Sequence, residues 1–415
     1  MSARWVVLTV VSVLAVHGCA TFNPRPLERV PFRERAQTKQ EDNVRVTASV
    51  PSAEESKQLF GVNLYKRSIQ PVWLEIENKN EEPVWFLPFG LDPDYFTPLE
   101  AAYLNHFAAP HSANAQMDRH FYESGMGLYI APGSVRSGFV FSKLDEGTKG
   151  FNVELIADGN RLWTFTFFIP VPGLRIDHRQ VDFKALYAED EFVSLDEEGL
   201  RRALESLPCC TTDKKGKGQG DPLNLVVIGS GEDVYHAFIR AGWDETETIY
   251  KASAIKTTIS FLFGGRYRYS PVSGLYVFGR PQDVALQKAR ETIHERNHLR
   301  LWLAPMLFQG QLVWVGQISR DIGVRFTTRT IVTHKIDPDV DETRAFVIQD
   351  LWYSQGLAKL AYVEGVGAAP ITEPRGNLTG DPYFTDGLRA VLWVSSDPVK
   401  LDDAEFVEWE IPPER

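Results

Sequence analysis

The stretch E-R-N-H-L-R-L-W-L, Glu295–Leu303, decides how the second half of this chain folds. Apolar and polar residues alternate in it, as is typical of a β-strand whose successive side chains point to opposite faces of a sheet. One face would carry three leucines, Leu299, Leu301 and Leu303. The other face would carry Arg296, His298, Arg300 and Trp302. The stretch therefore predicts a sheet with one apolar face and one face rich in cationic side chains.

Two neighbouring segments extend this pattern. A second alternating run, Gln311–Ile318, leads into S-R-D-I-G at Ser319–Gly323. The segment T-H-K-I-D-P-D-V-D-E-T-R follows at Thr333–Arg344. In an antiparallel pair, side chains of neighbouring strands on one face lie close together, so Asp321 is expected near His298. The short turns between these segments should also return His334 to the same network.

Three interpretations of this cluster stay open. An arginine–histidine face rimmed by aspartates suits a phosphate or carboxylate, and the candidates are Arg296, His298, Arg300, Asp321, His334 and Asp337. A metal could be held by His294, His298 and His334, with a position left for water. This second interpretation also includes acid–base catalysis by His298, His334 and Asp321. In the third interpretation the same residues form a structural ion-pair network without a ligand.

The N-terminal half has a different pattern. Short alternating stretches separated by turn residues predict an antiparallel β-sandwich over about residues 42–178, ending near a Pro170–Gly173 breaker. Residues 91–120 look irregular. They contain three histidines, His106, His111 and His120, which fit an exposed polar loop or a metal site.

Helical signals appear after residue 180. A capping box at Ser194–Glu197 predicts a helix to about Leu207, and Ser230 should cap a helix that follows the buried strand Leu223–Ile228. Asp337 should cap the last long helix, with Pro338 at its first position. The predicted fold class is α+β. The β-sandwich is followed by a mixed α/β domain over residues 180–415 whose sheet is largely antiparallel.

Composition narrows the classes of partner and the redox chemistry. The 415 residues are 43% hydrophobic and 24% charged, and their formal net charge is −11. A net acidic chain disfavours nucleic acid as a partner, because phosphate binding needs a basic surface. Besides Cys19, the only cysteines are the adjacent Cys209 and Cys210, for which a vicinal disulfide and two buried thiols both fit.

The first residues indicate an export signal. Arg4 precedes a short apolar run, and V-H-G-C ends at Cys19, so residues 1–18 resemble a bacterial lipoprotein signal in which Cys19 is lipidated. An ordinary signal peptide or an uncleaved anchor is the alternative. Residues 19–41 would then be a tether. We expect the protein to be anchored to a membrane and to face the periplasm, with the outer membrane favoured over the inner one. We also expect another envelope protein to bind the β-sandwich.

Several motifs in order resemble one family. They are D-P-L-N-L-V-V-I-G, A-G-W, P-V-S-G-L-Y-V-F-G-R-P-Q-D, R-N-H-L-R-L-W, W-V-G-Q-I-S-R-D-I-G and T-H-K-I-D-P-D-V-D-E-T-R. Over about residues 205–365 they are similar to the LssY C-terminal domain family. The resemblance identifies no catalytic residues and no cofactor. It implies a function close to a membrane. We therefore expect a lipid-anchored accessory or ligand-binding protein of the cell envelope. The alternative is a metal- or acid–base-dependent hydrolase of phosphate-containing or lipid substrates.

Overall fold

The computed structural model describes residues 22–109, 111–174, 181–246, 274–289, 296–325 and 333–413. The chain divides into two compact units, one of Met1–Leu144 with Val153–Phe165 and one of Asp145–Asn152 with Thr166–Arg415. Cys19 and His294 lie outside the described residues. The predicted division of the chain at residues 178–180 stays a prediction. None of the described helices is long and apolar enough to cross a membrane.

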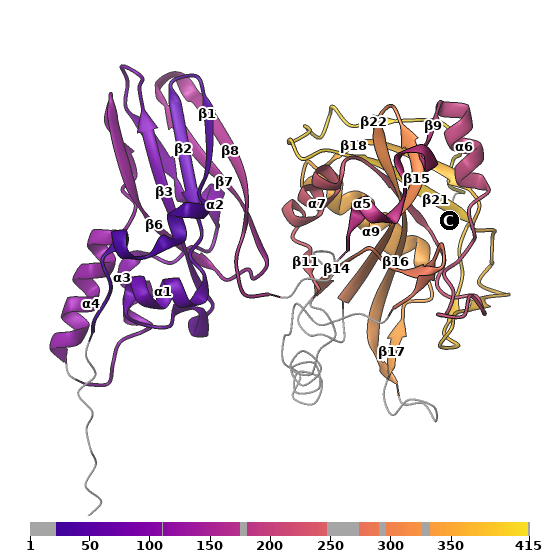
Figure 1. Cartoon of the computed structure of the whole chain (residues 1–415), viewed down its shortest axis with the longest axis horizontal. Coiled ribbons are helices and arrows are strands. Elements are labelled where there is room, and N and C mark those ends of the chain that lie inside the picture. Colours follow the sequence, from indigo (N-terminus) through magenta and orange to yellow (C-terminus); the bar gives the residue numbers. More distant parts are fainter. Residues whose placement is uncertain are drawn as a thin grey trace, which may run out of the picture. The chain divides into compact units, whose positions relative to one another are not determined.

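Two antiparallel sheets account for most of the first half of the chain (Figure 1). One has the strand order β1 (Gln37–Glu41), β2 (Val44–Ser49), β3 (Ile69–Asn78), β6 (Ser134–Lys143). The other has the order β5 (Tyr129–Ile130), β4 (Val84–Leu87), β7 (Thr148–Ala157), β8 (Arg161–Pro170). The antiparallel pairing predicted from the alternating stretches is confirmed. The turn after Asn78 joins strands of different sheets rather than the two arms of a hairpin.

The first half also contains helices that the sequence did not predict. They are α1 (Ala53–Phe60), α2 (Pro88–Leu91), α3 (Pro98–Tyr103) and α4 (His111–Ser124). The expectation that residues 91–120 are an irregular loop was therefore wrong. Within this segment His106 bonds Asp118 at 2.7 Å, and His120 bonds the backbone oxygen of Leu59 at 2.9 Å. Two of the three histidines thus have separate structural partners.

The second half is built around one large sheet. Among the described residues its main path has the order β11 (Asp244–Glu245), β14 (Val284–Ala289), β15 (Arg296–Phe308), β16 (Gln311–Arg325), β10 (Leu225–Ile228), β21 (Leu388–Val394), β18 (Leu357–Glu364), β22 (Glu405–Phe406). Two strands lie off this path, β17 (Thr333–Ile336) on β16 and β9 (Val193–Leu195) on β15. Two-stranded ribbons add β12 (Tyr276–Val277) with β13 (Arg280–Pro281) and β19 (Arg375–Gly376) with β20 (Pro382–Tyr383).

Helices lie on both faces of this sheet (Figure 1). The helices of this half are α5 (Phe183–Leu186), α6 (Glu197–Glu205), α7 (Gly231–Arg240) and α9 (Val340–Tyr353). On one face, which we call the apolar face, α7 and α9 pack on Leu299, Leu301 and Leu303. On the other, the polar face, α6 packs on a smaller core that includes Trp302. Strand order is mixed, since β10 runs parallel to β21 and antiparallel to β16, which confirms the α+β class with a largely antiparallel sheet.

The helix caps correct two sequence predictions. Ser230 caps α7 through a capping box with Asp233, as predicted. The helix predicted from Ser194 instead begins after Asp196, whose carboxylate accepts from the backbone N–H of Gly199. The cap of α9 is Asp339 and not Asp337. The backbone N–H of Asp337 donates to the carbonyl oxygen of Arg320, which continues the β-pairing by one residue and delays the helix.

The adjacent cysteines form a disulfide, Cys209–Cys210. Of the two alternatives that the sequence left open, the structure shows the vicinal disulfide. The pair lies in the loop between α6 and β10, where Cys210 is buried and its sulfur lies 3.6 Å from the hydroxyl of Tyr383.

Candidate functional site

Strand β15 positions the candidate residues through its register with both neighbours. His298 lies opposite Gln287 of β14 and Ser319 of β16. Arg300 lies opposite Gln317 of β16. Directly opposed residues in antiparallel strands share a face, so these side chains form rows across the polar face. We call Gln287, Arg296, His298, Arg300, Gln317 and Asp321 the polar cluster.

Asp321 is the centre of the charged contacts in the polar cluster. Its Oδ2 lies 2.7 Å from His298 Nε2 and 3.6 Å from Arg296 Nε. The first distance is a hydrogen bond, whereas the second is an ion pair beyond hydrogen-bond length. All three side chains are buried, with at most 7% of each exposed. The short connection between β15 and β16 brings Asp321 beside His298, which is the juxtaposition expected from strand parity.

Each arginine of the cluster also bonds a glutamine on a neighbouring strand. Arg296 Nη1 donates to Gln287 Oε1 at 2.7 Å, and Arg300 Nη1 donates to Gln317 Oε1 at 2.8 Å. Sequence reasoning missed both glutamines. Their place in the alternation of each strand could have revealed them. Gln287 lies opposite His298 and Gln317 lies opposite Arg300, so both side chains fall on the polar face. A polar residue in an otherwise apolar alternating strand indicates a buried polar partner.

Burial controls the protonation of the cluster. It lowers the pKa of His298 to about 4, against the opposing effect of the Asp321 carboxylate, and the charge of Arg296 lowers it further. Burial likewise lowers the pKa of Arg296 to about 10, although Asp321 raises it. At neutral pH the imidazole is therefore neutral. A proton on Nε2 would be donated to Asp321, which leaves Nδ1 as an acceptor.

Three buried polar atoms of the cluster have no hydrogen-bond partner in the structure as described. They are Arg296 Nε, His298 Nδ1 and Gln317 Nε2. Two of these atoms are donors and one is an acceptor. Buried polar atoms are nearly always bonded in folded proteins, so three on one sheet face mark a place where a further polar group can bind.

A second aspartate lies close to the cluster. Burial raises the pKa of Asp221, while a hydrogen bond from Asn377 Nδ2 to its Oδ1 at 2.8 Å and the charge of Arg300 lower it. Asp221 precedes β10 and was not predicted as a site residue. Asp221 therefore places a second carboxyl beside Arg300, in addition to Asp321.

The other candidates lie apart from these contacts or cannot be placed. His334 is in β17, where its backbone pairs with Val324, and its side chain is not among those described. Asp337 precedes α9, and its Oδ1 accepts from the backbone N–H of Asp339 at 3.1 Å. His294 and Cys19 lie outside the described residues. Within the described residues, no group of three or more His, Cys, Asp or Glu side chains is arranged to hold a metal ion.

A separate buried ion pair occurs near the N-terminus of α9. Arg344 donates to both carboxylate oxygens of Asp386, at 3.0 and 2.6 Å. The neighbouring Asp341 accepts from the Thr385 hydroxyl at 2.7 Å and from the backbone of Asp386 at 2.6 Å. These groups bond one another, although Arg344 Nε has no partner among the described residues, and we interpret them as a structural tie between α9 and the segment before β21.

The comparisons with known proteins assign part of the chain to a family. No curated protein matches the chain. Residues 201–388 match the family model described as LssY C-terminus, which covers the polar cluster and most of the large sheet. The match extends the predicted region of residues 205–365 at both ends. Residues 201–388 of this chain are therefore an LssY C-terminal domain.

Proposed function

We propose that the LssY C-terminal domain of this chain binds an oxyanion, a phosphate or a carboxylate, at the polar cluster. The observation that carries the proposal is the set of three buried atoms without a described partner, Arg296 Nε, His298 Nδ1 and Gln317 Nε2. A tetrahedral oxyanion can accept from the two donors, and a protonated oxygen of the same ligand can donate to His298 Nδ1.

Charge supports the same ligand class. Arg296 and Arg300 are both buried, Asp321 and Asp221 are the carboxyl groups that interact with them, and burial raises the pKa of Asp221, which disfavours its charged form. Removing two guanidinium groups from water is costly unless enough negative charge compensates them. An anionic ligand would add negative charge beside both guanidinium groups.

Binding of inorganic phosphate to the full chain, measured by isothermal titration calorimetry, tests this proposal. We expect saturable binding that Arg296→Gln weakens by about tenfold or more, which corresponds to loss of one charge-assisted contact. The matched control is Arg320→Gln. Arg320 directly precedes Asp321 in β16. Its side chain donates to Asn297 and lies over the ring of Phe346, outside the polar cluster. Absence of saturable binding of both phosphate and acetate, or equal losses in both variants, would contradict the proposal.

The His298–Asp321 pair favours a second candidate function, an acid–base hydrolase of phosphate-containing or lipid substrates. A neutral histidine whose Nε2 is held by a carboxylate presents Nδ1 as a general base. Hydrolysis of an aryl phosphate by the full chain, abolished in His298→Asn and retained in Arg320→Gln, would establish it. Phosphate binding without turnover would leave the accessory role.

We also propose that a lipid on Cys19 holds the protein on a membrane of the cell envelope. The support is the sequence V-H-G-C after an apolar run too short to anchor the chain well by itself. In cells given labelled fatty acid, the unmodified chain should carry label and sediment with membranes, whereas Cys19→Ser should lack label. The control is Cys209→Ser, which alters an internal cysteine. Label on the Cys19→Ser chain, or none on the unmodified one, contradicts lipidation.

A partner in the envelope is the third part of the proposal. Trp85 of β4 and Tyr129 of β5 are 48% and 44% exposed, and their ring centroids lie 5.0 Å apart. Exposed paired aromatics supply apolar contact area with little loss of conformational entropy, as protein interfaces require. This pair supports a role of the N-terminal sheets as an interaction module.

A further inference from the structure

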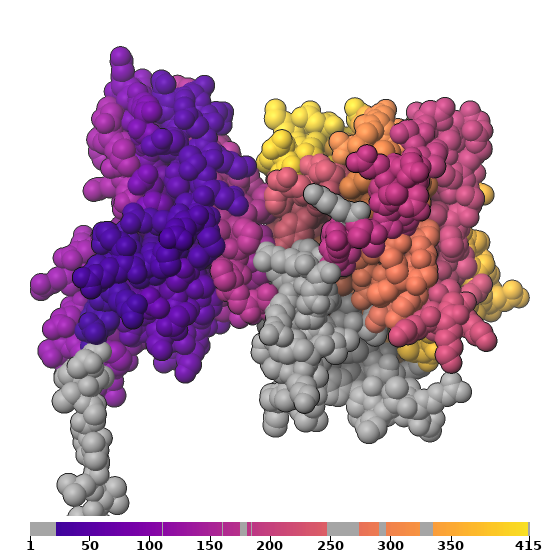
Figure 2. Space-filling model, viewed as in Figure 1, coloured from indigo at the N-terminus to yellow at the C-terminus, as the bar shows by residue number. Residues whose placement is uncertain are grey.

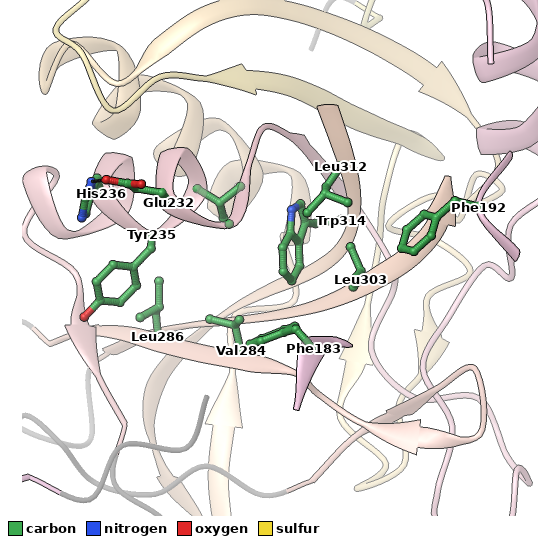
Figure 3. A pocket seen from close by; sticks show the side chains of 12 residues that line it. Phe183, Phe192, Glu232, Tyr235, His236, Val284, Leu286, Leu303, Leu312 and Trp314 are labelled. Atoms are coloured by element: carbon green, nitrogen blue, oxygen red, sulfur yellow. Dashed lines mark ion pairs between the residues drawn. The ribbon is translucent and has the colours of Figure 1, made fainter. Parts of the chain in front are cut away.

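A cavity of about 480 Å³ lies on the apolar face of the large sheet (Figure 3). Its strand wall is formed by Val284, Leu286, Leu303 and Trp314. Phe183 and Phe192, from the segment before α6, line it from another side. In the space-filling view this magenta segment lies over the orange strands (Figure 2). The cavity is therefore bounded by a sheet and by a separate strap of chain.

The walls of this cavity are hydrocarbon. Val284, Leu286 and Leu303 are each at most 9% exposed although they border it. The indole N–H of Trp314 already donates to the carbonyl oxygen of Gly229 at 3.2 Å, so the ring offers only carbon to the cavity. Protein interiors are close-packed and seldom keep apolar voids of this size, whereas ligand pockets span roughly 300–1,000 Å³.

Polar side chains lie at one end of this cavity. Figure 3 shows Glu232 and His236 together on α7, at the end of the cavity away from Phe192. His236 Nδ1 lies 3.7 Å from Glu232 Oε1, and the glutamate side chain is 76% exposed. A carboxylate at this end disfavours an anionic group there and accepts a hydrogen bond from a hydroxyl or an ammonium group.

We infer that this cavity binds the aliphatic chain of a single-chain amphiphile whose head group is neutral or cationic. The chain lies against the strand wall and the two phenylalanines, and its head lies beside Glu232. The site is independent of the polar cluster. It uses the opposite face of the same strands, and its ligand has the opposite preference in charge.

Photoaffinity labelling of the full chain tests this site. The probes are dodecanol, dodecylamine and laurate, each carrying a diazirine in the alkyl chain, and labelled peptides are mapped by mass spectrometry. We expect label in the peptides that contain Phe183–Phe192 and Leu312–Trp314. The alcohol and the amine should label about threefold more than laurate, the size of effect that one exposed charge produces. Glu232→Gln should remove that difference.

A variant that fills the cavity is compared with a matched control outside it. Leu312 lines it and is half-buried, so Leu312→Trp adds bulk inside it and should lower labelling by about tenfold or more. Leu401→Trp, at a residue 42% exposed outside the lining, is the matched control and should label as the unmodified chain does. If circular dichroism shows that Leu312→Trp is unfolded, Phe192→Asp serves instead. Equal labelling of the folded blocking variant and the control, or label confined to other peptides, overturns the inference.

Discussion

The two faces of β15 are equally buried and are stabilised in different ways. On the apolar face Leu299, Leu301 and Leu303 pack against α7 and α9, where any side chain of similar size and shape would contribute. On the polar face His298 and Arg296 share one charged partner, Asp321, and Arg296 also bonds Gln287. A face stabilised by apolar packing loses stability in proportion to the side-chain volume removed. A face stabilised by ion pairs is strongly destabilised when one buried charge is left without its partner. Alternation in sequence predicts the two faces but not this difference.

Removal of Asp321 should give the largest effect. Asp321→Ala leaves Arg296 and His298 buried without their common acceptor, and we expect a loss of about 3–5 kcal/mol in the free energy of unfolding. Urea denaturation measures it, with the exposed Asp403→Ala as the control. Added phosphate should restore part of the loss if the cluster binds oxyanions. A loss below that of the control would show that Asp321 is not a necessary partner.

A cavity on the apolar face should cost somewhat less. Leu301 is fully buried in the core cluster, so Leu301→Ala should destabilise by about 2–5 kcal/mol, near 3 in the middle of that range. This loss should be the same with and without phosphate and at pH 5 and pH 8, because no titrating group is involved. Urea denaturation under these four conditions checks it. A pH-dependent loss would mean that the two faces are coupled.

The paired face should also respond to acid. The pKa of His298 is lowered from 6.5 to about 4 in the folded chain, so between these values the unfolded chain binds more protons. The contribution is fully present above pH 6.5 and is lost as the pH falls toward 4, at up to about 1.4 kcal/mol per pH unit. His298→Gln should flatten this part of the stability curve. Superimposable curves for the two chains would contradict the neutral, buried histidine.

The smallest expected effect concerns the helix that covers the apolar face. Ser230 caps α7 by accepting from the backbone N–H of Asp233 at 3.0 Å. Ser230→Ala should cost about 1 kcal/mol, and Ser230→Asn should restore most of it. Thermal unfolding of the three chains gives the comparison. No loss in the alanine variant would show that packing alone holds α7 on the sheet.

The sequence predicted the β15 pattern and the closeness of His298 to Asp321, because strand parity and a tight connection leave few alternatives. It did not predict that the polar side of β15 is buried. Arginine and histidine on an alternating strand normally indicate a solvent-facing surface. Burial here depends on the glutamines of two other strands and on Asp221, which is distant in sequence.

Helix boundaries show where local reasoning fails. The motif at Thr97–Glu100 is a capping box with Pro98 at the first helical position, and it could have revealed α3 among the histidines. At Asp337–Asp339 two aspartates compete for the cap of α9. Asp339 caps the helix because Asp337 is still bonded to Arg320 of the sheet, a tertiary contact that no local pattern contains.

One consequence follows from the place of β21 in the sheet. The family match ends at residue 388, where β21 begins, yet this strand lies between β10 and β18 and contributes Ala390 and Leu392 to the core. During synthesis, the strands up to β18 emerge from the ribosome before the strand that joins them. Until then two inner strands are open edges, which are prone to pair with other chains. Chain segments cut at the family boundary would keep those edges permanently, so expression of this domain should include β21 and β22.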